Sequence, residues 1–461
     1  YRFTLLNIDS NETRLHDPSS THTEELDITR NSADSIFAQK LTTALTDNTP
    51  EPYFDLIKQI NPKVKLTLGG SKIGMYTDMK MIDHIFVGYS ETMVIDFLHS
   101  ISGKGLRRIF NKMIDHDQKA QAPVWDYTVS KTTYTEFDFI KAQEPLALEV
   151  ARGCRFKCKY CSYPLIGMKN ISSYLKKSDV LRQELMYNYE NFGATRYFII
   201  DDTFNDSVEK MEYFLEITRS LPFKITYWCY LRLDLLMAKP KTIPMLLESG
   251  MSSCYFGIET FNHAAGKAVG KGADPKKLKE TLFECKRVWG DNVHIQAGFM
   301  VGLPFEDSAS VFETAKWLER EDCPIDTKWI FPLQIAQANN DIMKYTYQSE
   351  FDKNSQMYGY EIPNPDVFWE WTKDDETDIN TLQKAEEVSN IAQNNMQNKI
   401  DKGDLNLASL SHPVLSNRDI TLKMSDQEYT DLVDSIDREQ LWLTDVTNDY
   451  FKPLINMLRL K

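Results

Sequence analysis

The chain has 461 residues, of which 42% are hydrophobic and 12% aromatic, with a formal net charge of −14. This composition is typical of folded proteins, and the length exceeds one compact core, so we expect two or three domains. The negative charge argues against duplex nucleic acid as the main partner, because such binding depends on clustered Lys and Arg. The sequence contains no run of 18 or more apolar residues, so no membrane span is expected.

Residues 1–125 are predicted to form a first domain. Apolar runs predict strands at 3–8, 63–68 and 82–88, and helices are expected at 35–45, 52–60 and 92–98. Strands that alternate with helices predict a parallel, Rossmann-like sheet. Gly69, Gly70 and Gly88 lie at the ends of two of these strands, where a missing side chain lets a ligand approach the backbone at the sheet's carboxyl edge.

Three cysteines at spacing C-x3-C-x2-C, Cys154, Cys158 and Cys161, follow the apolar run 145–150, which predicts a buried strand. We therefore expect them on a loop at a strand end, where α/β folds carry their chemistry. A ferredoxin usually holds its cubane cluster with four cysteines. Here only three are close together, and the next cysteine, Cys229, is far along the chain. Three thiolates therefore suit an iron–sulfur cubane in which one iron lacks a protein ligand. The alternatives are a zinc site or three unrelated buried thiols.

The four remaining cysteines are scattered and suggest no disulfide framework. Buried, hydrophobic thiols are the expected reading for those in strand-like runs. Free thiols in a folded chain are typical of a reducing compartment, so we expect a cytoplasmic protein.

Residues 126–340 show a regular strand–helix rhythm. Strands are predicted at 145–150, 196–200, 225–230, 253–258, 293–301 and 327–333, and helices at 178–189, 207–220, 240–248, 275–289 and 309–319. Six such units predict a partial (β/α)6 barrel, open on one side, with polar residues gathered at the carboxyl ends of its strands. Residues 341–461 are rich in polar residues and are predicted to be a mainly helical third region, with helices at 377–399, 426–436 and 447–460.

The cysteine motif, with the aromatic Tyr160 just before its last cysteine, resembles the signature loop of the radical S-adenosylmethionine (SAM) superfamily. The resemblance implies an enzyme in which the three cysteines hold a [4Fe–4S] cluster and the open iron chelates the amino and carboxylate groups of SAM. One electron then releases a 5′-deoxyadenosyl radical. A reductant such as flavodoxin or ferredoxin, and a small-molecule, peptide or protein substrate, are the implied partners.

By the same resemblance, Tyr160 is expected against the adenine, Asp202 at the SAM amino group and Arg232 at the SAM carboxylate, a task suited to a bidentate guanidinium. Each polar residue also has a plain alternative. Asp201 or Asp202 could cap the following helix. Arg232 could pair with Asp234 on the surface.

Glu259 resembles the acid that binds the ribose hydroxyls, and Val301 with Gly302 resembles the segment that frames the adenine. An acid at the end of an apolar strand needs a partner, which favours a functional reading of Glu259. Gly302 could instead serve only as a turn residue. Lys271 also matches a pattern that recurs in the superfamily, with a solvated lysine as its alternative.

The first domain resembles the cobalamin-binding domain of one large subgroup, in which Gly69, Gly70, Asp83, Gly88 and Glu91 match over about half the domain. The histidine loop that contacts cobalt in some members is absent. A Rossmann-like domain without its cofactor, or a scaffold, is the alternative. The subgroup implies methyl transfer to an unactivated carbon. The alternatives are a cobalamin-independent rearrangement, cyclisation or epimerisation, and a non-enzymatic cluster-bearing sensor.

Overall fold

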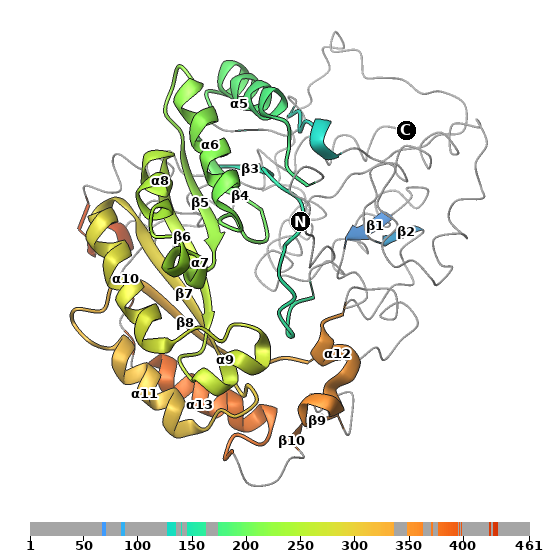
Figure 1. Cartoon of the computed structure of the whole chain (residues 1–461), viewed down its shortest axis with the longest axis vertical. Helices are drawn as coiled ribbons and strands as arrows, with labels where there is room; N and C mark the ends of the chain where they lie inside the picture. The colour runs from blue at the N-terminus through green and yellow to red at the C-terminus, as the bar shows by residue number, and fades with distance from the viewer. Residues whose placement is uncertain are drawn as a thin grey trace, which may run out of the picture. The chain divides into compact units, whose positions relative to one another are not determined.

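The structure is a computed structural model, and it describes only part of the chain (Figure 1). The described residues are 67–70, 84–87, 127–134, 140, 145–162, 174–335, 348–362, 370–371, 377–394, 396, 398, 424–425 and 427–431. Contacts divide the chain into two compact units. One comprises Tyr1–Trp125, Asn340–Thr346 and Asp434–Lys461, and the other comprises Asp126–Asn339 and Tyr347–Val433.

The first unit contains a parallel strand pair, β1 (Thr67–Gly70) and β2 (His84–Val87). Gly69 pairs with Phe86 and Gly70 with Val87, so both predicted glycines belong to β1 itself. A parallel pair agrees with the Rossmann-like prediction, because parallel neighbours require a crossover connection. Gly88 and the other elements predicted for residues 1–125 lie outside the described residues.

The second unit is built on a six-stranded, all-parallel sheet in the order β3-β4-β5-β6-β7-β8. Strand order follows chain order, and β3 and β8 stay unpaired with each other, so the predicted open partial barrel is confirmed. The strands are β3 (Leu146–Leu148), β4 (Arg196–Ile199), β5 (Thr226–Leu231), β6 (Met251–Glu259), β7 (His294–Val301) and β8 (Thr327–Pro332).

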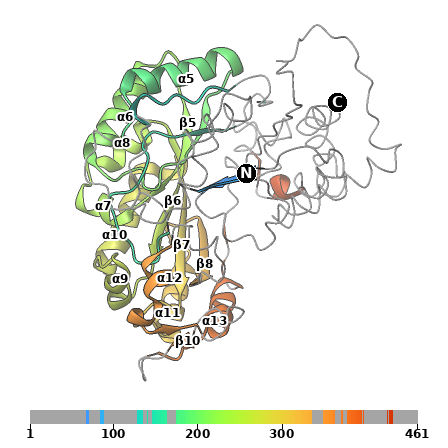
Figure 2. The ribbon, with the colours of Figure 1, turned by 90° about the vertical axis from the view of Figure 1, so that its right-hand side faces the viewer.

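The helices between the strands cover one face of this sheet (Figure 2). Tyr227, Phe256 and Phe299 point to that face: Tyr227 packs on Phe214 of α6, Phe256 on Trp289 of α10, and Phe299 near α11 through Phe261. The helices are α5 (Ser178–Phe192), α6 (Val208–Ser220), α7 (Leu233–Ala238), α8 (Thr242–Glu248), α9 (His263–Val269), α10 (Pro275–Trp289) and α11 (Ser308–Leu318).

Local sequence explains where the longer helices begin. The side chains of Ser207, Asp274 and Asp307 accept hydrogen bonds from the backbone N–H groups of the first turns of α6, α10 and α11. Because Ser207 caps α6, the alternative in which Asp201 or Asp202 caps this helix is wrong. The short helices α7 and α9 were not predicted, because they directly follow strand ends and offer too few residues for a periodic pattern.

Helix α13 (Leu382–Asn394) lies along the outer edge of β8. Ser389 donates to the carbonyl of Ile330 (2.7 Å), and Gln393 accepts from the Ile330 amide (2.8 Å) and donates to the Lys328 carbonyl (3.1 Å). Asn398 exchanges two further hydrogen bonds with the Lys328 backbone. Side chains therefore satisfy the edge groups that a seventh strand would otherwise use.

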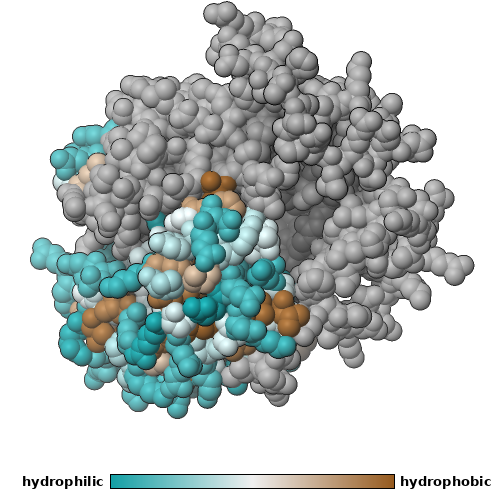
Figure 3. All heavy atoms as spheres, turned by 90° about the horizontal axis from the view of Figure 1, so that it is seen from above, coloured by the Kyte–Doolittle hydropathy of each residue, from teal (hydrophilic) through white to brown (hydrophobic). Residues whose placement is uncertain are grey.

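The described part of the third predicted region also contains α12 (Glu350–Asn354) and a short antiparallel pair, β9 (Tyr360–Glu361) with β10 (Glu370–Trp371). None of the described helices has the length and apolarity needed to cross a membrane. The described surface seen in Figure 3 is largely hydrophilic, with small separate hydrophobic patches.

Candidate active site

The cysteine loop follows β3 and is fixed at its base by Asp201. The buried Asp201 carboxylate accepts hydrogen bonds from the amides of Val150 (2.8 Å) and Ala151 (3.0 Å). Its other oxygen lies 2.7 Å from the fully buried Nζ of Lys210, on α6. Two backbone donors and a cation satisfy a charge that would be costly to bury alone. Asp201 therefore joins the start of the loop to the end of β4 and to α6.

Cys154 and Cys158 are buried and Cys161 is partly exposed. The Cys154 sulfur lies 3.4 Å from the Thr203 hydroxyl and accepts from the Phe156 amide, and the Cys158 sulfur accepts from Nη1 of Arg232 (3.1 Å). Burial raises the pKa of the Cys154 thiol. Hydrogen-bond donors aimed at sulfur suit a thiolate, so the donor set fits an iron–sulfur cluster.

The side chains of the described residues do not form a ready-made group of three metal ligands. Binding a cluster through all three cysteines therefore requires their side chains to turn toward one another. The loop lies between the ends of β3 and α5 and contains no helix over residues 151–162, so this turning breaks no helical hydrogen bonds.

Arg232, which follows β5, pairs with Asp234 and also contacts the cysteine loop. Its Nε and Nη2 pair with both carboxylate oxygens of Asp234, at 3.0 and 2.7 Å. This pair is not the surface pair of the alternative, because the Arg232 side chain is only 7% exposed. The remaining Nη1 faces the Cys158 sulfur, and the guanidinium lies 4.1 Å from the centroid of the Phe156 ring. Arg232 thus contacts the cysteine loop from the end of β5.

Asp202, unlike the adjacent Asp201, has no cation paired with its carboxylate in the described part of the chain. Its carboxylate receives no hydrogen bond from any residue in the described part of the chain, and it is partly buried. Burial, with help from the negative charge of Asp201 and against the charge of Lys210, raises its pKa to about 6. A buried carboxylate without a cation favours an incoming positive group.

Tyr160 joins the cysteine loop to the end of β6. Its hydroxyl donates to Oε1 of Glu259 (2.6 Å), 99 residues away in the sequence, and Nζ of Lys271 lies 2.8 Å from the same oxygen. Lys271 also donates to the carbonyl of Gly257 (2.6 Å). Burial and the Glu259 charge raise the pKa of Tyr160 well above its ordinary value, so it is a donor at neutral pH. Lys271 is thus paired rather than solvated.

The backbone at Glu259 is also unusual, since its φ is +70°, a value that residues other than glycine rarely adopt. The pairing of β6 with β7 shifts register between Gly257 and Glu259. This irregularity turns the Glu259 side chain over Gly257, where a Cβ would come within 2.6 Å of Oε1. The strain and the glycine together place the carboxylate at the sheet's edge.

The end of β7 is held by a residue that sequence reasoning missed, Glu306. Its carboxylate, inside the fold, accepts from the amides of Gly302 (3.0 Å) and Leu303 (3.3 Å) and from the Thr260 hydroxyl (2.9 Å). Burial raises its pKa to about 7. Gly302 has φ +94°, and its carbonyl accepts from the buried Tyr360 (2.7 Å). Gly302 therefore lies in a turn, and Val301 before it is buried in the sheet.

The predicted site residues of the second unit gather at three neighbouring places. In the cysteine loop, Cys158 contacts Arg232 and Tyr160 contacts Glu259. Thr260, next to Glu259, donates to Glu306, which also binds the amide of Gly302. Gly69 and Gly70 belong to the other unit. Lys210 and Glu306 were not predicted, because nothing local distinguishes them from surface charges.

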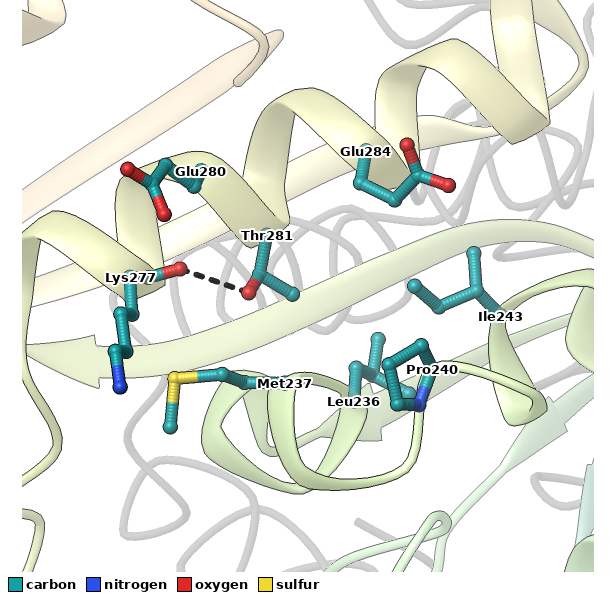
Figure 4. A pocket seen from close by; sticks show the side chains of 8 residues that line it. All are labelled: Leu236, Met237, Pro240, Ile243, Lys277, Glu280, Thr281 and Glu284. Carbon is teal, nitrogen blue, oxygen red and sulfur yellow. Dashed lines mark hydrogen bonds between the residues drawn. The ribbon is translucent and has the colours of Figure 1, made fainter.

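A pocket of about 300 Å³ lies elsewhere, between α7 and α10 (Figure 4). Figure 4 shows apolar side chains from the α7–α8 segment facing the polar side chains of α10. The lining residues are Leu236, Met237, Pro240, Ile243, Lys277, Glu280, Thr281 and Glu284. None of them belongs to the cysteine loop or to a strand end, so this pocket is separate from the candidate site.

Among curated proteins, the chain is similar to bacteriochlorophyllide d C-8(2)-methyltransferase of Chlorobaculum tepidum, with 19% identity over 245 residues, 52% of each protein. The chain thus spans about half the length of the relative that it matches. Among solved structures it resembles the radical SAM methyltransferase TsrM of Kitasatospora setae, determined with tryptophan and a SAM analogue (12% identity, TM-score 0.47, covering 62% of this chain and 59% of that one). It also resembles the cobalamin-dependent enzyme OxsB (14% identity, TM-score 0.44, covering 70% and 46%).

The family comparison addresses the domain that carries the candidate site. Residues 148–318 match the model described as "Radical SAM superfamily". The matched segment begins in β3 and ends with α11, and it includes the cysteine loop, Asp202, Arg232, Glu259 and the Gly302 turn. This segment, which carries the candidate site, is therefore similar to the radical SAM superfamily.

Proposed function

We propose that this chain is an enzyme that reductively cleaves SAM at a [4Fe–4S] cluster held by Cys154, Cys158 and Cys161. When bound, the cluster supplies one electron that breaks a carbon–sulfur bond of SAM and gives methionine and a 5′-deoxyadenosyl radical. The observation that carries the proposal is the 2.6 Å hydrogen bond between Tyr160 and Glu259. It joins the cysteine loop to an acid on another strand end, as a site for one extended ligand requires.

Different residues of the chain are proposed to bind different groups of SAM. The unpaired Asp202 carboxylate suits the SAM ammonium, because the positive group relieves a charge that burial disfavours. Arg232 reaches the cluster loop with Nη1 and suits the SAM carboxylate. The second oxygen of Glu259 suits a ribose hydroxyl, while Oε1 stays occupied by Tyr160 and Lys271. The Gly302 turn offers backbone to the adenine.

The test uses the full chain, reconstituted with iron and sulfide without oxygen. We expect about four iron per chain and release of 5′-deoxyadenosine from SAM when dithionite is added. Cys158→Ala is expected to lose both iron and SAM cleavage, whereas Cys285→Ala, which removes a buried thiol of α10, is the matched control and keeps both. A cluster-loaded chain that leaves SAM intact would contradict the proposal.

The further reaction is proposed to be cobalamin-dependent methyl transfer to an unactivated carbon. The support is the methyltransferase relative, the cobalamin named for OxsB, and the sequence resemblance of residues 1–125 to a cobalamin-binding domain. The parallel pair β1–β2, with Gly69 and Gly70 at the carboxyl end of β1, is the described part of that domain and fits a ligand near the backbone.

Cobalt analysis separates this proposal from its alternative. Protein produced with cobalamin supplied should retain about one cobalt per chain, and Gly70→Val is expected to reduce that content without changing iron content. If cobalt is absent while SAM is still cleaved, the alternative holds. The chain would then be a cobalamin-independent radical enzyme with residues 1–125 as scaffold, and the product of SAM cleavage would serve a rearrangement, cyclisation or epimerisation.

A further inference from the structure

The sheet face opposite the helices carries a connected row of aromatic rings. Trp228 and Tyr230 alternate along β5 with the residues that point to the helices, such as Tyr227. Ring centroids lie 4.4 Å apart between Phe198 and Trp228, 4.6 Å between Trp228 and Tyr230, and 5.7 Å between Tyr230 and Tyr255. The rings thus cross three adjacent strands without a break.

The edge strand β8 adds two exposed rings on the same side. Trp329 and Phe331 are 39% and 50% exposed, and their rings are nearly parallel, 7° apart with centroids separated by 6.0 Å. Trp329 pairs with Gly298 in the sheet register, which aligns these rings with the face formed by β5 and β6. Large exposed rings that gather on one face commonly mark a binding surface. The aromatic face consists of Phe198, Trp228, Tyr230, Tyr255, Trp329 and Phe331.

Two glycines connect the aromatic face to the candidate site. Gly257 and Gly298 are partners in the β6–β7 register. The Glu259 carboxylate lies over Gly257, and the Tyr255 hydroxyl lies over Gly298, where an added Cβ would collide with it. The aromatic face therefore continues directly from the acid that we propose to hold the SAM ribose.

One polar group on this face has no partner. The indole Nε1 of Trp228 is buried and forms no hydrogen bond within the described part of the chain. Buried donors are rarely left unpaired, and an unpaired one calls for an explanation. An acceptor atom on a ligand stacked against the row would supply the missing bond.

We infer that the aromatic face is the substrate site of the proposed radical enzyme, and that its substrate is a flat, conjugated ring system bearing a hydrogen-bond acceptor. This inference rests on the proposed function. Aromatic rings favour other flat π-systems through offset stacking and edge-to-face contacts, beyond the area that they bury. A ring held here lies beside Glu259, and so beside the ribose carbon on which the radical is proposed to form.

The experiment measures binding by equilibrium dialysis to the cluster-loaded full chain in the presence of SAM. The flat probe is protoporphyrin IX, and the comparison probe is cholate, a saturated, non-planar carboxylate. Trp329→Leu and Phe331→Leu, which keep apolar surface but remove the ring, are each expected to weaken protoporphyrin binding by about 2- to 12-fold. Phe312→Leu replaces a similarly exposed ring, 38%, on α11 and is expected to change binding less than 2-fold.

The result separates the two proposals, because SAM cleavage is measured in the same samples. Unchanged protoporphyrin affinity in both β8 variants, or cholate binding as tight as protoporphyrin binding, would overturn the inference even if SAM is cleaved normally. Failure to cleave SAM would instead count against the proposed function. Trp228→Phe, which keeps a ring and removes the unpaired donor, is expected to weaken protoporphyrin binding while leaving cholate binding unchanged.

Discussion

The partly buried Asp202 should destabilise the ligand-free protein at neutral pH. Its pKa is about 6 in the fold against an ordinary value of 3.8, a difference that corresponds to roughly 3 kcal/mol. Because the carboxylate keeps some contact with water, we discount this to about 1–2 kcal/mol. The folded protein holds the Asp202 proton between pH 4 and 6 and the unfolded chain does not, so this carboxyl costs stability as pH rises through 6.

Asp202→Asn removes this charge and is expected to be more stable than the parent protein by about 1–2 kcal/mol at pH 7.5, with little difference at pH 4.5. The assay is urea unfolding of ligand-free protein, followed by tryptophan fluorescence at several pH values and compared as midpoints. Asp201→Asn is the matched control at the adjacent residue. Its loss of the Lys210 pair should destabilise by about 3–5 kcal/mol.

The same variant should bind SAM more weakly, and SAM affinity of the parent protein should rise with pH through 6 as Asp202 ionises. A variant that is less stable at pH 7.5, or a stability difference that does not depend on pH, would refute the assignment of a raised pKa. Stabilisation without any loss of SAM affinity would refute the proposed role toward the SAM ammonium.

Three further predictions concern the strand ends. Lys271→Met leaves Glu259 without its cation and should lower stability by about 3–5 kcal/mol, which urea unfolding measures, while raising KM for SAM. Arg232→Lys keeps the charge but loses the forked geometry, and should weaken SAM binding about tenfold in equilibrium dialysis. Glu306→Ala should lose about 1–3 kcal/mol at pH 5.5 and less at pH 8, because the parent protein loses stability as Glu306 ionises near pH 7.

Each of these predictions has its own control. For Lys271, the double variant with Glu259→Gln should recover stability, because it removes the unpaired charge. For Arg232, iron content should stay at the parent level, since otherwise weaker binding would reflect a missing cluster. For Glu306, a loss of stability that is equal at both pH values would contradict its raised pKa.

The sheet was predictable because each strand is a short apolar run followed by polar residues. The sequence predicts all six strands of the second unit within a few residues, and α10 has the predicted bounds. The short helix α7 was missed because six residues starting right after Arg232 leave no periodicity to detect. Helix α13 is shorter than the predicted 377–399, since it begins only at Leu382 and ends at Asn394.

The site was predictable as a set of strand ends but not as a set of contacts. Sequence alone could not separate Asp201 from Asp202, because the difference depends on Lys210, a residue of α6 that reaches only one of them. It could not identify Glu306 either, since a glutamate near a helix start normally faces solvent. The burial of these charges follows from tertiary packing, which local pattern does not encode.

The hydrogen bonds from α13 to β8 occupy backbone groups at the edge of the six-stranded sheet. With the Lys328 and Ile330 backbone already satisfied by Gln393 and its neighbours, the sheet cannot grow by recruiting another segment or a second molecule. A chain that ends before residue 382 would lack α13. The edge of β8 would then be uncovered, which favours pairing between copies of the chain.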